Sequence, residues 1–178
     1  MSSHIPLKDV KELVTQPRIV EAGKLIYQSL QKTGIERPKV AVAALNPHGG
    51  DGGVCGREEI DIIKPAVDEL NERGYPVAGP FPADTVFLKV RDGEFDAVVT
   101  MYHDQGQIAI KLLGFEKGVT VQGGLPVVIT TPAHGTAFDI AGQNKANVNA
   151  TLNAYNLACV MGTSEFRARE ARVKELES

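Results

Sequence analysis

The sequence predicts an α/β fold in which a parallel or mixed β-sheet is flanked by helices. Segments with helical apolar spacing alternate with short apolar runs that are typical of buried strands. The 178 residues include 18 glycines and 10 prolines, which favours a chain with many turns over a plain helical bundle. Hydrophobic side chains make up 43% of the chain and charged side chains 23%, so an ordinary globular core is expected.

The first predicted elements are a helix at 17–33 and a strand at 39–45. The helix is indicated by four apolar residues at helical spacing: Ile19, Ala22, Ile26 and Leu30. It is expected to end at Gly34, because glycine is the usual residue after a helix C-terminus. Residues 39–45 are short, apolar and preceded by Pro38, as in a strand that is buried on both faces.

Further elements follow in the same alternation. Helices are predicted at 57–73, 83–90, 104–113, 149–162 and, as a charged tail helix, 164–178. Extended segments are predicted at 77–78, 96–101, 119–122 and 125–130. One face of the helix at 57–73 is expected to be apolar and buried: Ile60, Ile63, Val67 and Leu70.

Several classes of protein are disfavoured by composition. A net charge of −3 with mixed signs gives no electrostatic footprint for nucleic acid, and no run of 18 apolar residues suggests a membrane span. Two cysteines are too few for a disulfide framework; Cys55 is expected to be a small loop residue and Cys159 a core residue. The first residues lack the pattern of a signal peptide, so we expect a cytoplasmic protein with no nucleic-acid or membrane partner.

Three loops that follow predicted strands could bind a ligand, because ligands of open α/β sheets lie beyond the carboxyl ends of the strands. Residues 46–56 combine five glycines with a histidine and an aspartate, which suits an anion; a flexible connection is the alternative. Residues 101–106 contain His103 beside Asp104, a pair that can bind a metal or transfer protons, or form only a hydrogen-bonded turn. Residues 132–142 form a loop of small residues and glycines, against whose backbone a planar ring could lie. A purely structural loop is the alternative.

Three of the four histidines, His4, His48 and His103, could together form a transition-metal site, since imidazole suits zinc, manganese, cobalt or nickel. They lie far apart along the chain and form no local ligand motif. The residues alone therefore leave a three-histidine metal site as one alternative among several.

Five motifs, taken in order, closely resemble those of the 4-hydroxythreonine-4-phosphate dehydrogenase family, which is related to the isocitrate and isopropylmalate dehydrogenases. The motifs are Ser3–Leu7, Leu45–Gly50, Gly79–Thr85, Met101–Gly106 and His134–Ala137. The resemblance runs from about Ser3 to Gly162 and corresponds to the C-terminal half of a family member.

The resemblance implies a truncated two-domain chain with an isocitrate/isopropylmalate dehydrogenase-like fold. Residues 1–122 would form the metal, substrate and dimerisation domain, and residues 123–178 the C-terminal part of the cofactor-binding domain. The family is homodimeric, with an active site shared between subunits. Its members oxidise a secondary alcohol of a phosphorylated hydroxy acid with NAD or NADP, after which the β-keto acid loses carbon dioxide, a reaction of pyridoxine biosynthesis.

The resemblance also implies roles for particular residues. The metal ligands would be His4, His48 and His103, drawn from both subunits, with zinc as the first choice and Mg, Mn or Co as alternatives. A divalent ion there would act as a Lewis acid on the hydroxyl group. The cofactor would be bound by His134, Gly135, Thr136, Ala137 and Asn147.

Two carboxylates and a lysine also match family site positions. Asp84 and Asp104 would orient histidines or accept protons, with a helix N-cap as the alternative for Asp84. Lys111 and Thr120 would bind substrate, with solvated surface as the alternative for Lys111. Thr120 and Ile129 stand where biosynthetic members carry asparagine and arginine, and the loss of an arginine removes a bidentate anion contact.

These departures leave other substrates open: threonate or erythronate 4-phosphate, or a cis-dihydrodiol carboxylate, on which relatives act. Two further alternatives are a catalytically incomplete fragment and a metal-dependent hydrolase that uses the same histidines.

Overall fold

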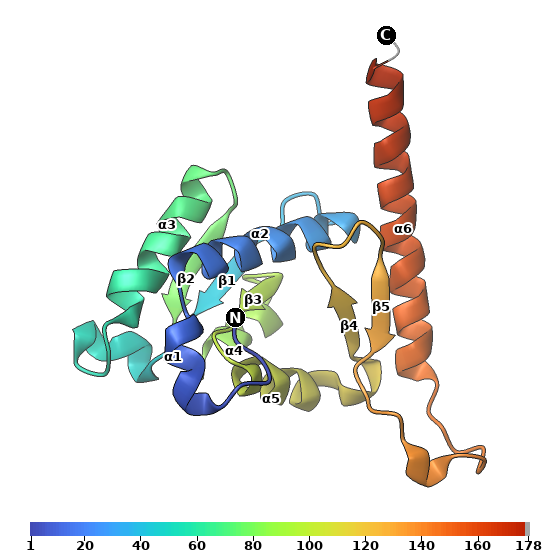
Figure 1. The fold of residues 1–178 in the computed structure, drawn as a ribbon, viewed down its shortest axis with the longest axis horizontal. Helices are drawn as coiled ribbons and strands as arrows, with labels where there is room; N and C mark the ends of the chain where they lie inside the picture. Colours follow the sequence, from blue (N-terminus) through green and yellow to red (C-terminus); the bar gives the residue numbers. More distant parts are fainter. Residues whose placement is uncertain (177–178) are drawn as a thin grey trace. The chain divides into compact units, whose positions relative to one another are not determined.

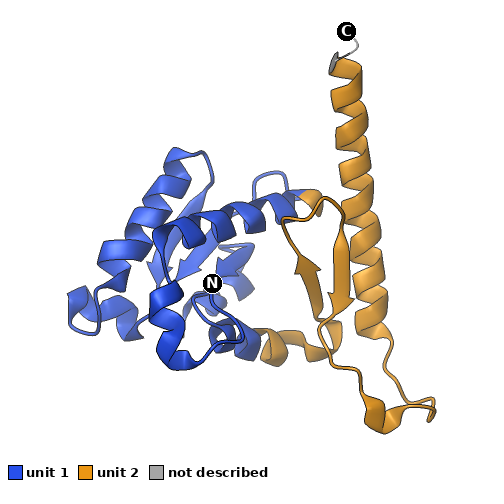
Figure 2. Cartoon of the chain, in the orientation of Figure 1, with its two compact units in different colours: residues 1–31, 35–109 blue, residues 32–34, 110–178 orange. Residues whose placement is uncertain are grey.

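The computed structural model describes residues 1–176, which divide into two compact units (Figures 1 and 2). The first unit comprises residues 1–31 and 35–109, and the second comprises 32–34 and the chain from Ile110 onward. Helix α5 (His103–Gly114) begins in the first unit and ends in the second. The assignment of metal-binding and cofactor-binding roles to 1–122 and 123–178 stays a prediction.

A three-stranded parallel sheet forms the centre of the first unit. Strand β1 (Val40–Ala43) lies between β2 (Val77–Phe81) and β3 (Ala97–Val99), in the order β2-β1-β3. All four residues of β1 are fully buried, as expected of an apolar strand covered on both faces. The predicted α/β class with a parallel sheet is confirmed.

The two faces of β1 contribute to different clusters of the core, because successive side chains of a strand point to opposite faces. Val40 and Val42 pack with residues of α2 (Gln16–Lys32) and α3 (Lys64–Glu72), which include Ile19, Val67 and Leu70. Ala41 and Ala43 pack with Val86 of α4 (Val86–Arg91). The short helix α1 (Val10–Leu13) adds Val10 to the first cluster.

The helix predicted at 57–73 is divided into a π-helical turn, Glu59–Ile63, and α3. Pro65 has no backbone N–H and so cannot continue the ordinary hydrogen-bond pattern with residue 61. The wider turn changes the phase of the helix. Ile60 is consequently 45% exposed, so its predicted place on the buried face is wrong, whereas Ile63, Val67 and Leu70 are buried.

The second unit contains an antiparallel hairpin and one long helix. Strands β4 (Val119–Gln122) and β5 (Ile129–Pro132) pair across the predicted glycine turn, and α6 (Asn149–Leu176) contacts both strands. The two helices predicted at 149–162 and 164–178 are therefore one helix within the described residues, because nothing at 163 interrupts it. Residues 177 and 178 of the predicted tail lie outside the described residues.

The buried face of α6 is formed by Ala150, Ala154 and Met161. At 100° per residue, Cys159 lies on the opposite side of the helix, and the structure places it in solvent. The prediction that Cys159 is a core residue is wrong. Within residues 1–176, no helix has the length and apolar content needed to span a membrane.

Candidate functional site

The N-terminal segment lies along the end of β3 and brings two histidines together. Ser2 forms a parallel bridge with Tyr102, and both its N–H and its hydroxyl donate to the Met101 carbonyl, at 3.1 and 2.8 Å. His4 and His103 follow this pairing directly in their segments. Their rings lie with centroids 5.4 Å apart, tilted by 55°.

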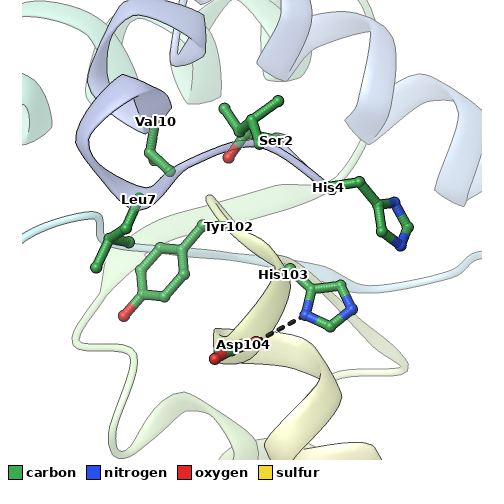
Figure 3. A pocket seen from close by; sticks show the side chains of 8 residues that line it. Ser2, His4, Leu7, Val10, Tyr102, His103 and Asp104 are labelled. Atoms are coloured by element: carbon green, nitrogen blue, oxygen red, sulfur yellow. Dashed lines mark hydrogen bonds and ion pairs between the residues drawn. The ribbon is translucent and has the colours of Figure 1, made fainter.

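A pocket of about 250 Å³ is built around these rings. It is lined by Ser2, His4, Ile5, Leu7, Val10, Tyr102, His103 and Asp104. Figure 3 shows the two imidazoles next to each other, with the Asp104 carboxylate against one nitrogen of His103. The pocket therefore combines an apolar wall with a polar end.

Asp104 orients the ring of His103. Its Oδ1 lies 2.7 Å from Nδ1 of His103, and the side chains are 42% and 68% exposed for His103 and Asp104. An Nδ1–H that donates to this carboxylate leaves Nε2 as the nitrogen with a free lone pair, which is the arrangement common to metal-binding histidines. The predicted orienting role of Asp104 is chemically consistent with this contact.

Gln105 fixes the start of α5, the helix that carries His103. Its Oε1 accepts the Met101 N–H at 2.8 Å, and its Nε2 donates to the Ala44 carbonyl at 2.9 Å. The amide thus joins the ends of β1 and β3. Sequence reasoning missed this role of Gln105, because the Ala44 carbonyl that it binds lies 61 positions away.

The glycine-rich loop has an unusual handedness. Six consecutive residues from His48 to Gly53 have positive φ, between 45° and 101°. Glycine adopts such values freely, but each of the two L-residues, His48 and Asp51, pays roughly 1–2 kcal/mol. His48 is exposed on this turn.

Two side chains after the loop, Glu58 and Glu59, hold its first residue, Asn46. The Asn46 amide donates to Glu58 Oε2 at 2.7 Å and to Glu59 Oε2 at 2.9 Å. Hydrogen bonds from its own backbone and from Asn46 lower the pKa of the Glu58 carboxyl, and Lys11 lies 3.4 Å from its Oε1. Sequence reasoning also missed both glutamates.

The structure brings His4 and His103 together but does not add His48 to them. Within residues 1–176, no three His, Cys, Asp or Glu side chains are close enough to hold one metal ion. A site with His4, His48 and His103 drawn from two subunits stays a prediction. The two imidazoles and the Asp104 contact fit a borderline ion such as zinc as two of its ligands.

The other predicted site residues are all exposed. Asp84 precedes α4, whose N-cap is Thr85, and the cap has no side-chain hydrogen bond, so the N-cap alternative for Asp84 is wrong. Lys111 lies on α5 and Thr120 on β4, both in the second unit. Their predicted roles in binding substrate remain predictions.

The predicted cofactor loop is an exposed, irregular segment. His134 Nδ1 lies 2.9 Å from the Gly135 carbonyl, and Ala137 has a left-handed φ of 48°. Asn147 Oδ1 accepts the N–H of Asn149 at 2.9 Å, an Asx turn that provides a partner for the first backbone donor of α6. Thr136 is exposed between them, and nothing in the loop resembles a Rossmann fingerprint.

The parallel sheet and the pocket around the imidazole pair at its carboxyl edge define an α/β protein with a candidate ligand-binding site. A family model described as pyridoxal phosphate biosynthetic protein PdxA matches residues 1–158. The chain belongs to this family, which confirms the resemblance found in its motifs.

The names of similar proteins and of similar solved structures agree with this family assignment. A Pseudomonas aeruginosa protein, "Putative 4-hydroxythreonine-4-phosphate dehydrogenase 2", is 59% identical over 91% of this chain and 49% of its own length. The crystal structure of a 4-hydroxythreonine-4-phosphate dehydrogenase from Klebsiella pneumoniae is 41% identical with a TM-score of 0.80, over 90% of this chain and 49% of that one. A terephthalate 1,2-cis-dihydrodiol dehydrogenase from Burkholderia xenovorans is 34% identical with a TM-score of 0.71, over 89% and 50%. The chain spans about half the length of the relatives it matches.

Proposed function

We propose that this chain forms half of a metal-dependent, NAD(P)-linked dehydrogenase that oxidises a secondary alcohol of a 4-phosphorylated hydroxy acid, with subsequent decarboxylation. The single observation that supports it best is the pair of imidazoles, His4 and His103, with Asp104 on the second ring. The names of the relatives give the reaction class.

The proposed metal ligands are His4 and His103 of one subunit, with His48 supplied by the partner in a homodimer. Zinc is the first choice, since imidazole ligands suit it, and Mg, Mn or Co are alternatives. When bound, the ion would supply Lewis-acid polarisation of the substrate hydroxyl, and a nicotinamide would supply the hydride acceptor. Asp104 orients the His103 ring, and Asp84 or Asp104 accepts the hydroxyl proton.

Substrate and cofactor binding are assigned to the second unit. Lys111 and Thr120 would contact the anionic group of the substrate, and the loop from His134 to Asn147 would contact NAD or NADP. Both regions are exposed, as binding surfaces must be. Domain roles of 1–122 and 123–178, and a cytoplasmic setting, are part of the same proposal.

A second substrate class has its own support. Thr120 and Ile129 stand in place of the asparagine and arginine of biosynthetic members. The bidentate contact of an arginine with the anionic group of the expected substrate is therefore absent. One structural relative is named a cis-dihydrodiol dehydrogenase. Threonate or erythronate 4-phosphate and a cis-dihydrodiol carboxylate are therefore the competing substrates.

Metal content and cofactor reduction test the proposal together. We expect purified wild-type chain to retain zinc, and His103→Ala to retain much less; equal contents would refute the metal site. Reduction of NAD⁺ or NADP⁺ would then be measured with each phosphorylated acid and with a cis-dihydrodiol carboxylate. Zinc binding without turnover of any substrate would identify a catalytically incomplete fragment, and phosphate release without cofactor would identify a hydrolase.

A further inference from the structure

We propose that Glu59 is a positioning residue for His48, because its buried carboxylate closes the loop 46–56 and sets where the imidazole is presented. The inference rests on the proposed metal-binding role of His48. It concerns a side chain that does not itself reach a ligand: Glu59 is only 3% exposed.

Both oxygens of Glu59 accept hydrogen bonds from the residues where β1 turns into the loop. Oε1 accepts the backbone N–H groups of Leu45 and Asn46, each at 2.8 Å. Oε2 accepts the Asn46 side-chain amide at 2.9 Å. The carboxylate therefore fixes the backbone two residues before His48.

The far side of the loop is packed onto the same carboxylate. A Cβ at Gly50 would lie 2.6 Å from Glu59 Oε2 and 2.9 Å from the Gly56 carbonyl, so this position admits only glycine. A Cβ at Gly56 would lie 2.4 Å from the Asn46 amide nitrogen. The Cys55 N–H donates to the Gly50 carbonyl at 3.0 Å, which closes the loop behind them. His48 lies between the two anchored points, Asn46 and Gly50.

A carboxylate is the group that this arrangement requires. All three donors are neutral N–H groups that point at one side chain, and an ionised carboxylate offers acceptors on both oxygens. A glutamine in its place would turn an NH₂ group toward at least one of these donors, whichever way the amide is oriented. The left-handed course of the loop then loses one of its fixed ends.

The adjacent residue provides a matched control. Glu58 also accepts the Asn46 amide, at 2.7 Å, but it contacts neither backbone N–H of the loop entrance. A glutamine at 58 keeps a carbonyl oxygen for the Asn46 amide, and it loses only the pairing with Lys11, which lies outside the loop. Glu58→Gln and Glu59→Gln are therefore the same chemical change, one residue apart, and only the second should disturb the loop.

The experiment measures Zn²⁺ affinity by calorimetry for the full chain and for His48→Ala, Glu58→Gln and Glu59→Gln. Amide hydrogen exchange of Leu45 and Asn46 is followed in parallel. We expect Glu59→Gln to weaken Zn²⁺ binding about tenfold or more, the scale of lost supporting contacts around metal ligands. Exchange at Leu45 and Asn46 should accelerate in that variant alone, with Glu58→Gln resembling wild type in both measurements.

The outcomes separate the inference from the proposed function. If His48→Ala binds Zn²⁺ as tightly as wild type, His48 is not a ligand, and both the metal role and the inference fail. If His48→Ala binds weakly but a folded Glu59→Gln binds normally, only the positioning role is refuted. Should Glu59→Gln not fold, the wild-type exchange decides: Leu45 and Asn46 must be protected well beyond the exposed amides of Asp51 and Gly52, and equal exchange overturns the inference.

Discussion

The loss of Gln105 has a consequence for stability that can be worked from its two hydrogen bonds. Gln105 is the partner of the Met101 N–H and the Ala44 carbonyl, and both of these residues are fully buried. Gln105→Leu keeps a side chain of similar size but removes both partners. A buried backbone group left without a partner costs about 1–3 kcal/mol, so the unfolding free energy is expected to fall by roughly 2–6 kcal/mol.

Urea denaturation followed by circular dichroism measures this loss. Gln107→Leu is the matched control. Gln107 is also a half-buried glutamine on α5, so the two variants carry the same chemical change on the same helix. The unfolding free energy is obtained from the midpoint and slope of the urea transition. The reasoning is refuted if Gln105→Leu lowers this free energy no more than Gln107→Leu does. A large loss that appears in the first variant alone would assign the energy to the junction of β1, β3 and α5.

Three further predictions follow from individual contacts. Asp104→Asn removes the carboxylate from Nδ1 of His103 and is expected to weaken Zn²⁺ binding, measured by calorimetry, about 10–100-fold. An unchanged affinity would show that this contact does not orient the His103 ring for metal binding. The lowered pKa of Glu58 means that its stabilising contribution is present above the unfolded-state pKa and is lost as the pH falls through the folded-state pKa. Urea unfolding between pH 7 and about pH 3 should therefore show a smaller fall in the unfolding free energy for Glu58→Gln than for wild type. Asn147→Ala removes the oxygen that accepts the Asn149 N–H and should cost about 0.5–1.5 kcal/mol, seen as fraying of the start of α6 by hydrogen exchange. Protection at Asn149 equal to wild type would show that this hydrogen bond does not hold the start of α6.

The layout of the fold was predictable where local patterns and tertiary packing agree. The apolar run that became β1 has no polar residue to place on either face, so burial on both sides was its only outcome. The spacing of Ile19, Ala22, Ile26 and Leu30 predicted α2 within a residue at each end, because its apolar stripe packs on that sheet. The pairing of His103 with Asp104 was also foreseen from their adjacency after a strand.

The misplaced residues depend on features that short patterns do not contain. Ile60 leaves the core because the π-helical turn before α3 adds to the helical period, and ordinary spacing assumes a constant 3.6 residues per turn. Cys159 is exposed because the hairpin selects one side of α6, and that choice is made by tertiary contact.

The supporting residues of the site were harder to foresee than the site itself. Glu59 and Gln105 look like ordinary polar helix residues in the sequence, since their partners include backbone groups 13, 14 and 61 positions away. The convergence of His4 on His103 likewise depends on the pairing of Ser2 with Tyr102, which joins the two ends of the first unit. Sequence spacing carries no trace of such contacts.

The turn from His48 to Gly52 is a mirror image of the backbone that L-amino acids prefer. In a semisynthetic version of the chain, D-alanine at Gly49 or Gly52 would take up the same positive φ without backbone strain, because this region is favoured by D-residues. L-valine would be strained there even though a Cβ in the L position meets no neighbouring atom. The repertoire of natural side chains at these positions is correspondingly narrow. Stereochemistry, more than polarity or size, therefore sets the range of substitutions that this turn can accept.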